Sequence, residues 1–180
     1  MTAVNLTEDF FTLFGLPLCY ELDSVTLADR FRKLQHTVHP DKFANASDLE
    51  RRLSVQQSAR INEAYQILKS PLRRAQYMLE LNGIDMSDDS TSVMDSSFLM
   101  QQIELRERLE HIKDSEHPVV QLEEMSHEID AALRELISSI TTLFNQSTEE
   151  ALKTIHDCVR RMQFMSKLQE QVHELEEEYL

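Results

Sequence analysis

The sequence lacks tryptophan and contains little glycine, proline or cysteine. Its 180 residues include two glycines, four prolines and two cysteines. So few helix breakers, beside abundant Leu, Glu, Gln, Met and Ala, predict an almost entirely helical protein. Runs of Val, Ile, Thr and aromatic residues at period two are missing, which argues against a β-sheet protein. The length suffices for one domain or two small ones, each with a modest core.

The two cysteines, Cys19 and Cys158, are far apart and form no C-x-x-C motif. Their spacing argues against a cysteine zinc site and a disulfide framework, and favours two reduced thiols. The opening MTAVNLTEDF has acids where a signal peptide needs a basic start and an apolar run. No apolar stretch approaches the length of a membrane span. We therefore expect a cytoplasmic protein with no membrane partner and no cofactor.

The chain carries a net charge of −14, and this charge is unevenly distributed. Residues 1–77 hold ten Lys/Arg and nine Asp/Glu, whereas residues 78–180 hold eight and twenty-three. The first part is therefore close to neutral and the second strongly acidic. This acidity argues against nucleic acid as a partner, because binding to phosphates needs positive charge. The asymmetry indicates two modules that bind different partners.

The first module is predicted to contain three main helices after a short apolar segment, NLTEDFFTLFGLP. The first main helix is predicted in SVTLADRFRKLQHTVHP, with Asp23 or Ser24 as its N-cap. Its apolar face comprises Leu27, Phe31, Leu34 and Val38. A second helix begins at about Ser47, and its apolar face comprises Leu53, Ile61, Ala64, Tyr65 and Leu68. A third short helix has Ser70 as its N-cap, Pro71 at its first position and Gly83 at its exit.

The second module is predicted to be an antiparallel bundle of three helices, at about 96–112, 118–145 and 148–178. The middle helix has an apolar stripe at spacings of three and four residues: Leu122, Met125, Ile129, Leu133, Leu136, Ile140 and Leu143. Ser147 and Glu150 have the spacing of a capping box before the last helix. The Ser- and Asp-rich residues 84–96 predict a linker. The expected division is therefore 1–83, linker 84–96 and bundle 97–180.

Between the first two helices lies the tripeptide His39-Pro40-Asp41, for which several interpretations are open. The simplest is a helix stop, because proline cannot continue a helix and displaces the preceding residue from helical geometry. Catalysis with His39 as base and Asp41 as its orienter lacks a nucleophile. A metal site from His36, His39 and Asp41 needs a spacing that the helix break makes unreliable. The tripeptide alone is a weak motif.

The context of the tripeptide favours a binding function. The motif INEAYQILKSPLRRAQY, which follows it, resembles the J-domain pattern N-x-A-Y-x-x-L-x-x-P-x-x-R-x-x-Y, and the resemblance covers about residues 8–80. J domains stimulate ATP hydrolysis by Hsp70 proteins, so the resemblance implies an Hsp70-contacting loop that includes Asp41. Acid–arginine contacts of the kind implied there fix orientation. Basic residues would steer docking onto Hsp70. The implied Hsp70-binding residues are His39, Pro40, Asp41, Arg30, Arg32, Lys33 and Lys42; for the basic ones, a solvated helix face is the alternative.

Over nearly its full length, the chain is similar to the HscB-type co-chaperones of iron–sulfur cluster assembly. The similarity is carried by FFTLFGLP, HPDKF, FLMQQIELRERLE and VRRMQFMSKLQEQ. It implies an all-α fold, a helical J domain followed by a three-helix bundle, and no enzyme activity. It also implies two partners, an HscA-type Hsp70 and an IscU-type scaffold protein. The alternative is a J-domain protein whose acidic bundle binds a different client or dimerises.

Helical periodicity identifies apolar residues on the outer face of the first bundle helix. Its core stripe comprises Phe98, Leu105, Leu109 and Ile112. Other apolar residues fall mostly on the far side of this helix, and Phe164 falls off the stripe of the last helix. Exposed apolar groups of this kind indicate a binding surface. The resemblance implies a scaffold-binding patch of Leu99, Met100, Ile103, Glu104, Glu107 and Phe164. The alternative is that these residues pack against the J domain or fill a thick bundle core.

Overall fold

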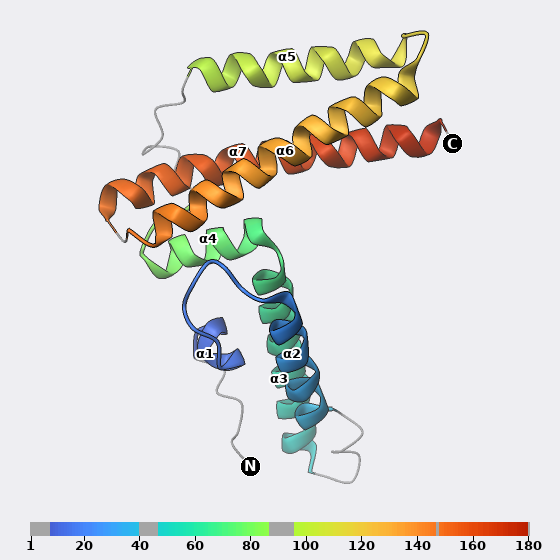
Figure 1. Ribbon diagram of the computed structural model, residues 1–180. Coiled ribbons are helices and arrows are strands. Elements are labelled where there is room, and N and C mark those ends of the chain that lie inside the picture. Colours follow the sequence, from blue (N-terminus) through green and yellow to red (C-terminus); the bar gives the residue numbers. More distant parts are fainter. Residues whose placement is uncertain (1–7, 40–46, 87–95, 147, 180) are drawn as a thin grey trace. The chain divides into compact units, whose positions relative to one another are not determined.

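The computed structural model describes residues 8–39, 47–86, 96–146 and 148–179, and these residues contain seven helices and no strand (Figure 1). The all-α prediction is therefore confirmed. The helices are α1 (Phe10–Phe14), α2 (Ser24–Val38), α3 (Asp48–Lys69), α4 (Pro71–Leu81), α5 (Ser96–Lys113), α6 (Pro118–Phe144) and α7 (Glu149–Glu178). Among these described helices, none combines the length and the apolar run that a membrane span needs.

The chain divides into two compact units, Met1–Met78 and Leu79–Leu180, and the division falls inside α4. The boundary expected from the sequence lay a few residues later, after residue 83. Residues 87–95, which make up most of the expected linker 84–96, lie outside the described residues. The division into 1–83, 84–96 and 97–180 therefore stays a prediction.

Helices α1 and α4 are both followed by a glycine that ends the helix. Gly15 and Gly83 have φ of 61° and 78°, in the left-handed region that a side chain disfavours. At each end the glycine amide and the next amide bond back to helix carbonyls, as in a Schellman motif. The amide of Leu16, for example, donates to the Phe11 carbonyl at 2.9 Å. The predicted exit at Gly83 is confirmed.

Helices α2 and α3 lie side by side as a helical hairpin (Figure 1). The rings of Phe31 and Tyr65 stack between them, with centroids 4.1 Å apart. The predicted start of α3 is confirmed, because Ser47 caps it in a capping box with Glu50. The predicted apolar face of α3 is wrong at Leu53, because this residue is 41% exposed. The fully buried members are Ile61, Ala64 and Leu68.

In the second unit, α5, α6 and α7 form the expected antiparallel bundle, in which α6 and α7 pair closely and α5 packs less extensively (Figure 1). Its core comprises Leu109, Ile112, Leu122, Met125, Ile129, Met165, Leu168 and Val172. The cap of α7 differs from the expectation at Ser147. Thr148 is the N-cap, and its hydroxyl accepts a 3.1 Å hydrogen bond from the amide of Ala151. Ser147 itself lies outside the described residues.

Candidate partner-binding sites

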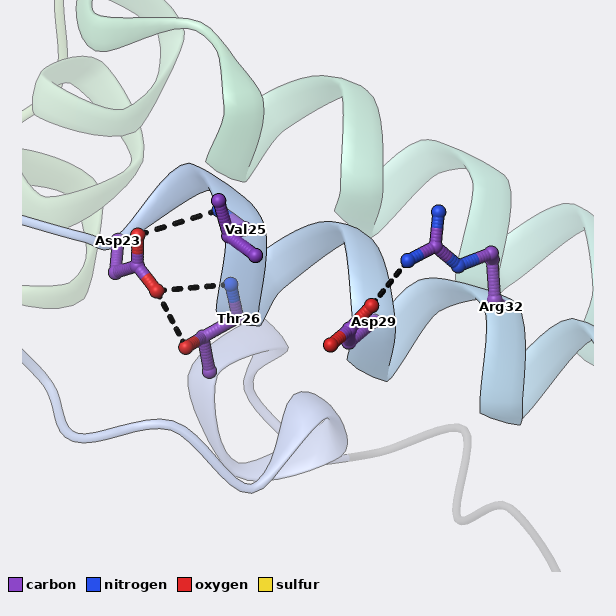
Figure 2. Close-up of polar contacts among 5 residues, drawn as sticks. All are labelled: Asp23, Val25, Thr26, Asp29 and Arg32. Atoms are coloured by element: carbon purple, nitrogen blue, oxygen red, sulfur yellow. Dashed lines mark hydrogen bonds and ion pairs between the residues drawn. The ribbon is translucent and has the colours of Figure 1, made fainter.

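The basic face expected to bind Hsp70 lies on α2, which begins at a strongly bonded cap. The Asp23 carboxylate accepts from the amides of Val25 and Thr26 and from the Thr26 hydroxyl (Figure 2). These hydrogen bonds, the Thr26 side chain foremost, lower the pKa of Asp23 below its ordinary value. Leu27 and Val38 are buried at the two ends of the apolar face. This burial fixes which side of α2 faces solvent.

The solvent face of α2 presents the three predicted cations, Arg30, Arg32 and Lys33, all of them exposed. They are not electrostatically equivalent. Arg32 forms an ion pair with Asp29, one turn earlier on the same helix (Figure 2). Neither Arg30 nor Lys33 forms an ion pair with another described residue. An exposed pair of this kind contributes about 0–1 kcal/mol, so Asp29 holds Arg32 only weakly.

The H-P-D tripeptide follows the last turn of α2. His39 is exposed and has φ −58° and ψ 128°, outside helical geometry. This agrees with the predicted effect of a following proline. Pro40, Asp41 and Lys42 lie outside the described residues, so their predicted contacts with Hsp70 stay predictions. The metal-site alternative, which requires Asp41, likewise extends beyond the described residues.

Residues of the INEAY and PLRRAQY motifs hold the first unit together. The Asn62 side chain accepts a 2.7 Å hydrogen bond from Gln35, which joins α3 to α2. The Tyr77 hydroxyl accepts a 2.9 Å bond from the amide of Phe10. Arg74 is buried, donates to the Leu68 carbonyl at 2.5 Å and lies over the Tyr20 ring. Burial lowers the pKa of Arg74, although a charged guanidinium remains at any ordinary pH.

In the second unit, α5 exposes three apolar side chains, as the helical periodicity predicted. Leu99, Met100 and Ile103 are 43%, 58% and 43% exposed. We call these three residues the α5 patch. Glu104 and Glu107, the predicted acidic rim, are also exposed on α5. Because adjacent apolar side chains gain nothing from water contact, the arrangement is suited to covering by a protein partner.

Phe164 differs from the expectation that it would be an exposed anchor. It is half-buried and packs against the core of the bundle. Its ring meets the edge of the Phe98 ring at 90°, with centroids 5.9 Å apart. The helical periodicity of α7 placed Phe164 off the core stripe. It gave no information about the neighbouring helix α5, which contributes Phe98. Phe164 therefore contributes packing as well as whatever surface it offers a partner.

Sequence reasoning missed the arginines around these rings. The guanidinium carbon of Arg106 lies 5.5 Å from the centroid of Phe164, and that of Arg161 lies 5.2 Å from the centroid of Phe98. Both are cation–π distances. Each pair joins α5 to α7, so periodicity within one helix carries no signal for it. The described ranges contain no cluster of three His, Cys, Asp or Glu side chains that could hold a metal ion.

Comparisons with known proteins agree with this architecture. The family model described as "HSCB C-terminal oligomerisation domain" matches residues 94–173. A "Co-chaperone protein HscB homolog" of Shewanella sp. (strain ANA-3) is 41% identical over 172 residues, which cover 96% of this chain and 99% of the relative. The homologue of Shewanella oneidensis is 42% identical over 173 residues, with the same coverage.

Two solved structures are also similar. Chaperone HscB from Vibrio cholerae has 41% sequence identity and a TM-score of 0.86, over 96% of this chain and 100% of that chain. Human co-chaperone protein HscB has 28% identity and a TM-score of 0.87, over 99% and 86%. The fold is thus a helical J domain followed by a three-helix bundle, which defines the class of J-domain co-chaperones. The chain belongs to the HscB family of co-chaperones.

Proposed function

We propose that this co-chaperone binds an IscU-type iron–sulfur scaffold protein, delivers it to an HscA-type Hsp70 and stimulates ATP hydrolysis by that Hsp70. The observation that carries the proposal is the α5 patch. Three neighbouring apolar side chains stay largely exposed on a helix whose opposite face enters the core. Exposed apolar side chains grouped in this way mark a surface that a partner covers.

The chemistry of the α5 patch fits a protein partner with its own exposed apolar surface. Burying a half-exposed apolar side chain contributes about 1–2 kcal/mol, so three anchors contribute about 3–6 kcal/mol of the ~8 kcal/mol that micromolar binding requires. Glu104 and Glu107 form an acidic border beside the anchors, which favours a partner that carries basic residues around its apolar surface. Phe164, held against Phe98, supplies a rigid aromatic element next to α5.

The J domain offers the second contact. Arg30, Arg32 and Lys33 on the solvent face of α2 would steer an acidic surface of Hsp70. Asp41, with His39, Pro40 and Lys42 around it, would dock against an arginine of Hsp70 and couple docking to ATP hydrolysis. The protein itself performs no catalysis in this scheme, and both partners meet it in the cytoplasm.

Joining the two sites in one chain raises the effective concentration of the scaffold beside the Hsp70. A covalently linked second site binds as an intramolecular event, at an effective concentration that reaches about millimolar for short linkers. A co-chaperone that acts in this way as a two-partner adaptor needs only modest affinity at each site. The expected outcome is a ternary complex in which Hsp70 receives its client from the bundle.

Calorimetry with the IscU-type scaffold tests the α5 patch. Ile103→Ala and Leu99→Ala should each weaken binding by about fivefold or more, because each removes an anchor at the centre of the interface. Val120→Ala is the matched control, since Val120 is 54% exposed at the start of α6. Phe164→Ala is unsuitable as a binding test because it also removes core packing. Unchanged affinity for both α5 variants would exclude the patch.

Self-association is the second candidate function of the α5 patch, and the matching family model is described as an oligomerisation domain. Light scattering on the full chain distinguishes the two. If the α5 patch pairs two copies, the mass should fall from dimer to monomer in Ile103→Glu, while the scaffold should not compete. If the α5 patch binds the scaffold, the free chain should remain monomeric at micromolar concentration.

A further inference from the structure

Three ring contacts join α5 to α7, and two of them are made by Phe98 in the N-terminal half of α5. Phe98 meets Phe164 edge to face, Arg161 lies over Phe98, and Arg106 lies over Phe164. Phe98 and Arg106 belong to α5, whereas Phe164 and Arg161 belong to α7. Every contact in this group of four, which we call the Arg–Phe stack, therefore crosses from one helix to the other.

The N-terminal half of α5 depends on the Arg–Phe stack because its other packing is slight. The buried residues of α5, Leu109 and Ile112, both lie in its C-terminal half. The forked ion pair from Arg108 to Glu128 on α6, at 2.5 and 3.1 Å, also lies there. The α5 patch lies in the other half, where Phe98 is the side chain turned towards α7. The stack thus holds the part of α5 that carries the patch.

A hollow beside Phe98 makes its orientation sensitive to Arg161. The hollow measures about 220 Å³ and lies among α5, α6 and α7, with Phe98, Arg161, Leu136 and Met165 in its lining. A ring with open space on one side is not fixed by close packing there. The guanidinium of Arg161 over the ring supplies the missing restraint, through a contact that favours one ring orientation.

We propose that Phe98 and Arg161 are positioning residues for the α5 patch. They hold Leu99, Met100 and Ile103 in the conformation that binds the partner, without touching it themselves. Holding a binding surface in its bound conformation raises affinity because the ordering cost is met before association. The inference rests on the proposed function, since it concerns the same surface and the same IscU-type partner.

A double-mutant cycle on the full chain tests this role, with affinity for the IscU-type scaffold measured by calorimetry. Arg161→Gln should weaken binding about twofold to fivefold, the range expected for one cation–π contact. Arg161→Lys, which keeps a cation, should restore most of the affinity. Phe98→Leu, which keeps apolar volume, should weaken binding more. The double variant should bind as Phe98→Leu does, because Arg161 acts through that ring.

Additive losses in the cycle would overturn the proposal, because they would mean that Arg161 contacts the partner directly. Full affinity in Arg161→Gln and Phe98→Leu would also overturn it. If Ile103→Ala still weakens binding in that case, the α5 patch stands and only the positioning role fails. If Ile103→Ala also leaves the affinity unchanged, the proposed function itself fails. The two failures are thereby distinguished.

Hydrogen exchange of the unbound chain provides a readout that does not depend on the partner. Arg161→Gln should speed exchange of the α5 amides near Ile103, because α5 opens locally when the contact between Phe98 and Arg161 of α7 is lost. The amides around Met125 in the core of α6 should keep their protection. Equal acceleration in both helices would mean that the variant loosens the whole bundle, which contradicts a positioning role.

Discussion

The hydroxyl of Tyr77 accepts a 2.9 Å hydrogen bond from the backbone amide of Phe10, and the two rings stack with centroids 4.5 Å apart. Arg60 completes this arrangement from α3, with its guanidinium carbon 4.3 Å from the centroid of Phe10. A residue of the PLRRAQY motif therefore fixes the first helix of the chain. The motif that identifies the J domain is in this respect a structural element.

Tyr77→Phe should lower the free energy of unfolding by about 1–2 kcal/mol, because the amide of Phe10 loses its acceptor while the ring stacking is kept. Tyr65→Phe is the control, since Tyr65 contacts Phe31 and Lys69 through its ring, which the substitution keeps. Urea denaturation followed by circular dichroism measures both. Equal midpoints for wild type and Tyr77→Phe would contradict the role given to the hydroxyl.

Arg74→Ala should destabilise the chain by about 2–4 kcal/mol. It removes the donor to the Leu68 carbonyl at the end of α3 and leaves a cavity beside Tyr20. Arg73→Ala, at the exposed neighbouring position, should change stability by less than about 0.5 kcal/mol. Thermal unfolding distinguishes the two, and similar melting temperatures for both variants would refute the structural role of Arg74.

The cap of α2 should give stability that depends on pH. Since the pKa of Asp23 is lowered from 3.8 by folding, its stabilisation is complete above that value and is lost as the pH falls through the folded-state pKa. Asp23→Asn should be less stable than wild type at pH 7, and the difference should shrink below pH 4. Chemical denaturation at a series of pH values checks this. A difference that grows towards acid would contradict the assignment.

Asp29→Asn should strengthen docking to Hsp70, because it releases Arg32 from its ion pair and adds positive charge to the basic face. At low salt, the concentration needed for half-maximal ATPase stimulation should fall about twofold to fivefold, and the gain should disappear at high salt. Asp48→Asn on α3 is a matched control, since Asp48 is paired with Arg51 in the same way. An equal gain in both variants would indicate a general charge effect.

Much of the fold follows from the sequence because it depends on local signals. Helix periodicity, the start of α3 at about Ser47 and the exit at Gly83 are properties of neighbouring residues, and the structure confirms them. Leu53 was wrong because it lies at the edge of the apolar stripe. At 100° per residue it falls about 80° from Ile61, whereas the adjacent Ser54 falls about 20° from Ile61 and is buried.

The candidate sites likewise contain some features that local sequence signals predict and others that depend on contacts between helices. The exposure of Leu99 and Ile103 followed from their angles on one helix. The burial of Phe164 did not, because it depends on Phe98 from another helix and on how the two helices are set against each other. The ion pair between Asp29 and Arg32 has a spacing that the sequence shows, but its geometry required the structure.

The proposed binding of two partners is tested most directly by ATP hydrolysis of the HscA-type Hsp70, measured with wild type or Asp41→Asn, in the presence and absence of the IscU-type scaffold. Wild type should stimulate hydrolysis, and stimulation should rise further when the scaffold is added. Asp41→Asn should abolish stimulation in both cases while still binding the scaffold with wild-type affinity. Undiminished stimulation by Asp41→Asn would contradict the proposed two-partner adaptor.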